Sequence, residues 1–380
     1  MIVNGVYIKV LGIIVVAICL KTAEKLERLF KLHRWYISIP FIGSILLIVL
    51  SKWGSGWFSL SFPPIFQRLV LTIFLFSIGY QIAFIFNRKY FYRVLFLIGI
   101  CLFLISSLHL VSFLFPDSMH WVLSSILFAY NLDVVYYTVP KQWISYIHYW
   151  GSIQMLVVFL LTPILLIIVE KRLRRLNHPS SLYLVHQYHE KMRIPINFTS
   201  FFVVFIAFLF VKLPAIFNIP FVYDYVYSMM FGLLIGYFFG HKKGKTKKAT
   251  IEQLGTVALY TFIMTTIIQN YQVHHNYFSI NIFLLILIKT FVIAFICFFV
   301  VYSFFQKLSY HERMVAFVAG WTFILNAPVV CMHGMRSVTN KLGAAPYVLL
   351  VIPPVILWLV NYLHVWLLQA LPRSFFDFLQ

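Results

Sequence analysis

Apolar residues gather into twelve stretches that short polar segments separate. The stretches lie at about 3–20, 36–51, 67–86, 94–115, 119–140, 150–170, 196–216, 221–240, 254–272, 280–305, 314–334 and 345–370. A helix of about 20 apolar residues crosses the hydrocarbon core of a bilayer. Hydrophobic residues make up 62% of the chain, charged residues 11%, and the mean hydropathy is +0.90. The pattern predicts one all-α polytopic membrane unit with no soluble domain.

Cations mark which side of the membrane each connector occupies. Of the 30 Lys and Arg residues, 23 lie in six segments: 21–34, 87–93, 171–193, 241–248, 307–313 and 336–341. Lys- and Arg-rich loops stay cytoplasmic, so we expect a plasma-membrane protein whose N-terminus lies outside. The formal charge of +20 would suggest a nucleic-acid partner in a soluble chain. Here the cations separate spans instead of lining one face, so no nucleic acid is expected.

The stretch 119–140 does not fit a simple alternation of crossings. If it crossed, the six cations of 171–193 would lie outside. It carries Asn131, Asp133 and Pro140, and polar or helix-breaking residues at membrane depth are tolerated where the chain turns back inside protein. The sequence therefore predicts a re-entrant hairpin at 119–140, entered from outside.

A second hairpin is predicted at 314–334. Cations flank this stretch on both sides, at 307–313 and 336–341, so it enters and leaves from the inside. It also holds two residues that favour a break in the helix, Asn326 and Pro328.

Each half of the chain then has five crossings and one hairpin before the last crossing, and the two halves are inverted. The first repeat covers 1–175, a cytoplasmic linker covers 176–195, and the second repeat covers 196–380. About ten transmembrane helices with two re-entrant hairpins, in inverted repeats, form the fold of a secondary transporter.

Five polar residues in the spans are candidates for a site. Asp133 is the candidate ion ligand, because an intramembrane acid needs a partner or an aqueous cavity, although a shallow hairpin tip would simply solvate it. Asn131, Asn326 and His333 are candidate solute ligands on the two hairpins. Lys289 lies about ten residues into its span; it could neutralise Asp133 or an anionic solute, or pair between helices.

Signals for an enzyme are missing from the sequence. It has no nucleophile elbow, HExxH, P-loop or dinucleotide fingerprint, and an intramembrane enzyme would need a second ionisable group beside Asp133. The four cysteines are far apart and suggest neither disulfides nor zinc. We therefore expect no enzymatic activity and no cofactor beyond sodium or a proton as coupling ion.

The C-terminal region 319–368 resembles the second hairpin and last helix of the bacterial glutamate:sodium symporter family. The shared features are Ala319-Gly320, Pro328, the run from Met335 to Thr339, Gly343, Pro353 or Pro354, and Asn361. The third apolar stretch, with Ser77, Ile78 and Gly79, is similar to that family's third helix. The resemblance implies a bacterial plasma-membrane homodimer, and it adds Asn361 to the candidate solute ligands.

Two functions follow as expectations. The first is a cation-coupled secondary transporter that moves a small polar or anionic solute by alternating access. The alternative is a transporter-derived sensor, scaffold or accessory subunit that no longer transports. The first hairpin holds no glycine and carries the bulky Tyr136 and Tyr137, while Trp321 lies in the second; these residues favour the alternative.

Overall fold

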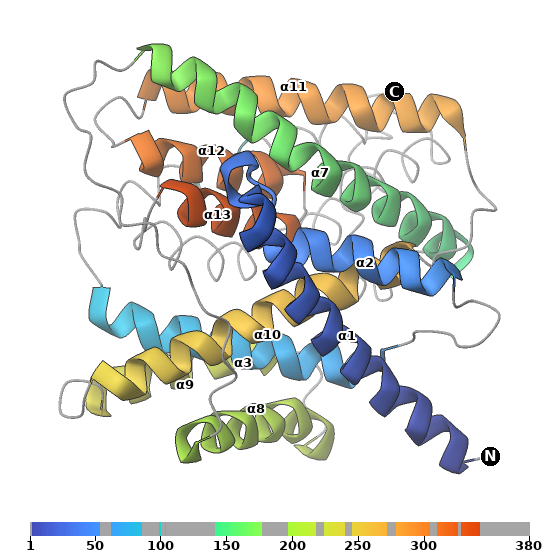
Figure 1. Cartoon of the computed structure of the whole chain (residues 1–380), viewed down its shortest axis with the longest axis vertical. Coiled ribbons are helices and arrows are strands. Elements are labelled where there is room, and N and C mark those ends of the chain that lie inside the picture. Colours follow the sequence, from blue (N-terminus) through green and yellow to red (C-terminus); the bar gives the residue numbers. More distant parts are fainter. Residues whose placement is uncertain are drawn as a thin grey trace, which may run out of the picture. The chain divides into compact units, whose positions relative to one another are not determined.

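The computed structural model describes residues 2–53, 62–85, 99, 103, 141–176, 197–217, 224–239, 245–271, 279–304, 310–325 and 328–342. Within these residues the regular structure is helical and contains no strand (Figure 1). The elements are α1 (Ile2–Phe30), the 3₁₀ helix η1 (Leu32–Trp35), α2 (Ile39–Trp53), α3 (Pro64–Ile85), α7 (Lys141–Leu176), α8 (Phe198–Phe217), α9 (Asp224–Phe239), α10 (Lys245–Tyr271), α11 (Ile280–Phe304), α12 (Tyr310–Ile324) and α13 (Pro328–Leu342).

Three of the described helices are long and apolar enough to cross a membrane. Their candidate spans are Tyr149–Arg174 in α7, Ala249–Gln269 in α10 and Ile280–Ser303 in α11. Four shorter apolar helical segments lie within α2, α3, α8 and α9. Large apolar side chains are exposed on α8 and α11, as expected of helices that face lipid. These are the features of a helical membrane protein.

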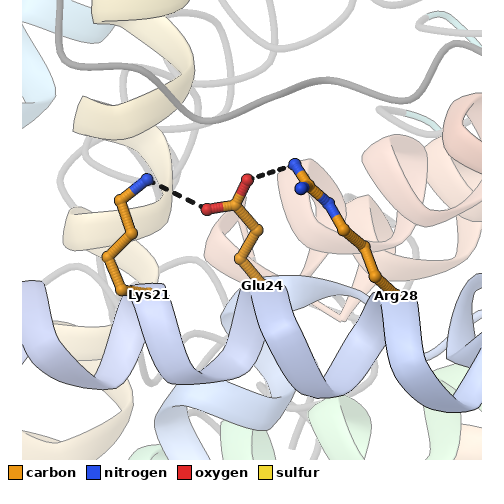
Figure 2. A network of polar contacts seen from close by, with 3 residues as sticks. All are labelled: Lys21, Glu24 and Arg28. Atoms are coloured by element: carbon orange, nitrogen blue, oxygen red, sulfur yellow. Dashed lines mark hydrogen bonds and ion pairs between the residues drawn. The ribbon is translucent and has the colours of Figure 1, made fainter.

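Helix α1 continues beyond its apolar stretch into the predicted connector 21–34. Glu24 accepts a hydrogen bond from Lys21 at 3.0 Å and pairs with Arg28, three and four residues away on the same helix face (Figure 2). Such pairs, together with good helix formers, favour a further turn of helix. The chain then leaves α1 at Lys31 and leaves η1 at Tyr36, both in the left-handed conformation.

The chain divides into two compact units, and each takes residues from both halves of the sequence. The described elements of the first unit are α1, η1, α2, α3, α8, α9 and all but the end of α10. Those of the second unit are α7, α11, α12 and α13.

The closest helix packing in the first unit is between α3 and α9. Built on Gly232, a Cβ atom would lie 2.2 Å from the Phe76 carbonyl oxygen, and on Gly79 it would lie 1.9 Å from the Met229 carbonyl oxygen. Only glycine permits this approach, and Gly232 with Gly236 forms the GxxxG spacing typical of closely packed membrane helices.

Helices α3 and α9 run in the same direction. The Ser228 hydroxyl donates to the Thr72 carbonyl at 2.9 Å, Gly232 lies against Phe76, and Gly236 lies against Tyr80. Each step of four residues along α9 is thus matched by a step of four along α3. The two helices are parallel over at least two turns.

Two side-chain hydrogen bonds to backbone carbonyls join α10 to α3 and to the residues just before α3. The buried Ser77 hydroxyl donates to the Ile251 carbonyl at 2.9 Å, and Gln269 donates to the Phe62 carbonyl at 2.8 Å. These side-chain bonds lie at opposite ends of α10 and fix its position along α3.

Several predicted features lie outside the described residues. They are the first hairpin (119–140), the predicted cytoplasmic linker (176–195) apart from Leu176, and the last apolar stretch (345–370).

Candidate functional site: a polar link at a helix break

Two short helices of the second unit lie where the second hairpin is predicted. Helices α12 and α13 have 15 residues each, fewer than the roughly 20 that a full crossing needs. Helix α12 ends at Ile324, Leu325 forms a turn, and Pro328 is the first residue of α13, a position that suits proline because its missing N–H would have no partner there. The two helices pack together: a Cβ atom on Gly334 would lie 2.7 Å from Val318 Cγ1.

The outer ends of α12 and α13 meet at the C-terminal end of α7. Glu170, on α7, pairs with Lys341 near the end of α13 at 2.5 Å and with Arg174 at 2.7 Å. The Arg174 guanidinium lies 5.9 Å from the ring centre of Tyr310, the first residue of α12. The start of α12 and the end of α13 therefore share one end of α7, which we call the hairpin base.

The break between α12 and α13 contacts α7 much further from its C-terminus. The Gln154 amide nitrogen donates to the Leu325 carbonyl at 2.6 Å. Gln154 precedes Glu170 by sixteen residues, which is about 24 Å of helix. We call the break between α12 and α13 the tip. The helix pair therefore extends along α7 from the hairpin base to the tip.

Lys289 of α11 completes a polar link across the tip. Its Nζ donates to Gln154 Oε1 at 3.2 Å. An ammonium only donates and a backbone carbonyl only accepts, so the Gln154 amide must turn its oxygen to Lys289 and its nitrogen to Leu325. The link of Lys289, Gln154 and the Leu325 carbonyl joins α11, α7 and the end of α12.

The electrostatics of this link are favourable to a cation. The last carbonyls of a helix lack intrahelical partners and carry partial negative charge, and Leu325 follows the last residue of α12. Gln154 is buried, with 3% of its surface exposed, and Lys289 is partly buried near the middle of its candidate span. A positive charge at such depth is expensive unless protein groups solvate it.

Aromatic side chains pack around the link. The Trp321 indole donates to the Thr290 carbonyl at 3.2 Å, which fixes α12 against the residue next to Lys289. Tyr149 and Trp150 form an edge-to-face pair at 5.2 Å and pack against Ile286, one turn of α11 before Lys289's neighbour Thr290. The indole of Trp321 and that of Trp150 are fully buried.

Of the residues predicted to bind solute or ion, His333 is the one that lies within the described residues. It is fully buried in α13, and its ring centre lies 4.9 Å from that of Phe159. Phe159 is five residues further along α7 than Gln154, so His333 packs between tip and base. Asn131, Asp133, Asn326 and Asn361 lie outside the described residues.

Sequence reasoning identified Lys289 as an unusual cation but missed its partners. The available signal was Gln154, a lone amide in an otherwise apolar stretch, which a search for charged residues alone passes over. The Leu325 carbonyl has no sequence signal beyond the neighbouring Asn326 and Pro328.

The described residues contain no group of three or more His, Cys, Asp or Glu side chains that could hold a metal ion. The chain matches no protein-family model, no curated protein and no solved structure.

Proposed function

We propose that the protein is a cation-coupled secondary transporter that moves a small polar or anionic solute by alternating access. The observation that carries this proposal is the polar link of Lys289, Gln154 and the Leu325 carbonyl at a break between two short helices. Transporters of inverted-repeat fold build their sites from discontinuous helices whose ends face ions and solute near the midplane. In a protein that is only a packed helical bundle, burying a lysine at this depth would cost free energy and serve no function.

The arrangement of α12 and α13 supports a re-entrant hairpin. Both of its outer ends lie at the hairpin base, and both include residues of cationic segments that the positive-inside rule assigns to the cytoplasm. The cations 171–175, at the end of α7, belong to the same side. Geometry and charge therefore agree on one face of the membrane.

The parallel packing of α3 and α9 supports inverted halves. The C-terminal end of each helix leads to a cationic segment, 87–93 after α3 and 241–248 after α9. Because α3 and α9 are parallel, their C-terminal ends lie on the same side of the membrane. Helix α3 is the third stretch of the first half, and α9 is the second stretch of the second half. These two stretches cross the membrane in the same direction only if the two halves start on opposite sides.

The two compact units also fit a repeated plan. The first unit combines α1–α3 with α8–α10, the first three described helices of each predicted repeat. Exchange of elements between halves is expected when both halves build one transporter together. We further propose that the transporter works as a homodimer in the plasma membrane.

Uptake into liposomes that contain the purified protein tests the function. The solutes are radiolabelled glutamate, aspartate, succinate and neutral polar amino acids, with an imposed sodium or proton gradient. We expect gradient-driven uptake of at least one solute, its loss in Gln154→Leu and Asp133→Asn, and its retention in Lys212→Met, whose lysine is exposed on α8. Uptake of none of these solutes under either gradient would contradict the proposal.

A second function, a scaffold or sensor without transport, is favoured by one observation. The side chains of Trp150, Trp321 and Tyr149, close to the link, are each at most 1% exposed. A region filled by large aromatic side chains leaves little room for a solute. The same uptake experiment separates the two functions, because a scaffold would give none.

A further inference from the structure

The tip of α12 and α13 is linked to a lysine of the protein itself. The Lys289 ammonium lies 3.2 Å from an oxygen of Gln154, and Gln154 in turn binds the Leu325 carbonyl. In transporters with broken helices, the free carbonyls at the end of a half-helix coordinate the coupling cation. Here a lysine is linked to such an end through Gln154.

We propose that Lys289 is the resident cation of the α12–α13 break and occupies the place of a dissociable alkali ion. This inference rests on the proposed transporter function and specifies the ion chemistry of its site. The break then needs no sodium ion. A sodium ion or proton bound elsewhere, for example at Asp133, is a separate matter.

The chemistry of the link supports this assignment. Sodium takes oxygen ligands, and the oxygens available at the link are Gln154 Oε1 and the Leu325 carbonyl. The Lys289 ammonium donates to the first oxygen, and the Gln154 amide nitrogen donates to the second. Gln154 relays between the two, since its amide presents an oxygen to the cation and a donor to the carbonyl.

Neighbouring contacts hold Lys289 in register with the break. The Trp321 indole binds the Thr290 carbonyl, so the residue after Lys289 is fixed to α12 four residues before Leu325. The Thr290 hydroxyl donates to the Ile286 carbonyl at 2.7 Å, and Ile286 packs on Tyr149 and Trp150 of α7. The ammonium is therefore positioned by packing on two helices and not by its flexible stem alone.

The experiment compares sodium responses in the full chain purified in detergent. Thermal unfolding midpoints are measured in sodium chloride and in choline chloride of equal ionic strength, for wild type, Lys289→Ala and the matched control Lys212→Ala. Truncation of Lys289 leaves space beside the Gln154 oxygen that it binds, so we expect Lys289→Ala to gain a sodium-specific rise of about 2 °C over wild type. Lys212→Ala should respond as wild type does.

A second variant keeps the test decisive if Lys289→Ala does not fold. Lys289→Met fills the same space without charge and removes the hydrogen bond that Lys289 donates to the Gln154 oxygen. Its unfolding midpoint should therefore fall by about 2 °C relative to Lys212→Met, and its response to sodium should not increase. The proposal is overturned if folded Lys289→Ala responds to sodium as wild type does, or if Lys289→Met is as stable as Lys212→Met. Failure of solute uptake would instead count against the proposed function, and these unfolding measurements would stand unchanged.

Discussion

Substitution of Gly232 by alanine should separate α9 from α3. The added Cβ would lie 2.2 Å from the Phe76 carbonyl oxygen and 3.1 Å from the Tyr80 backbone nitrogen. A carbon approaches a carbonyl oxygen to about 3.3 Å at the closest in ordinary packing, so the helices must move apart by about 1 Å. A gap of that size removes about a quarter to a half of the dispersion attraction between the facing atoms.

The expected free-energy change is a balance of two effects. Because the obstructing atoms belong to backbone, we place the steric cost at the upper end for overpacking, about 3 kcal/mol. Alanine is favoured over glycine within a helix by about 1 kcal/mol, which offsets part of this. Gly232→Ala should therefore lower the free energy of unfolding by about 2 kcal/mol, which is roughly 3 °C in the unfolding midpoint of a chain of this size.

Two other glycines serve as matched controls. A Cβ atom added to Gly43 would lie 2.6 Å from the Met264 sulfur, and the end of a methionine side chain can move aside. Gly99 is helical and exposed, with nothing within 4 Å of an added Cβ. Both alanine variants should be as stable as wild type or slightly more stable, as measured by tryptophan fluorescence on heating in detergent. If the unfolding midpoint of Gly232→Ala equals those of the controls, the backbone contact between α3 and α9 is wrong.

Three further predictions concern the hairpin and the topology. Glu170→Gln should lower the free energy of unfolding by about 2 kcal/mol, since Lys341, whose side chain is 17% exposed, loses its carboxylate partner. An unchanged melting curve would argue against the Glu170–Lys341 ion pair at the hairpin base. Trp321→Phe keeps the ring but removes the bond to the Thr290 carbonyl and should cost about 1 kcal/mol in thermal unfolding. Single cysteines at Lys89 and Lys245, in a background without native cysteines, should react with an impermeant maleimide only from the cytoplasmic side; labelling from opposite sides would contradict parallel α3 and α9.

The sequence pattern predicted the helical membrane class because it depends on local composition. The apolar runs at 150–170, 254–272 and 280–305 match the three long candidate spans closely. Helix ends were less predictable. Ion pairs extend α1 through the basic residues after Leu20, and α10 begins inside the lysine cluster at Lys245, because lysine and glutamate are good helix formers wherever they lie.

The polar link could not be predicted in the same way. Its two bonds join residues 135 and 171 positions apart in the sequence, and neither partner is marked by periodicity. Gln154 is the one amide side chain in an apolar stretch, and a backbone carbonyl is not marked by any residue type. Only the packing of α7 against α11 and α12 brings them together.

Most cations of this chain lie in the predicted connectors, and Lys289 does not. Arg174 and Lys341 lie at the ends of α7 and α13, in segments predicted to be cytoplasmic, and both bind Glu170 at the hairpin base. In the proposed topology, orientation and hairpin stability therefore depend on the same charges. Their removal should therefore weaken both properties together. Lys289 lies far from any connector, and a charge there contributes nothing to orientation that the connectors do not already supply. The proposed role as resident cation at the tip of α12 accounts for the cost of burying it in the membrane.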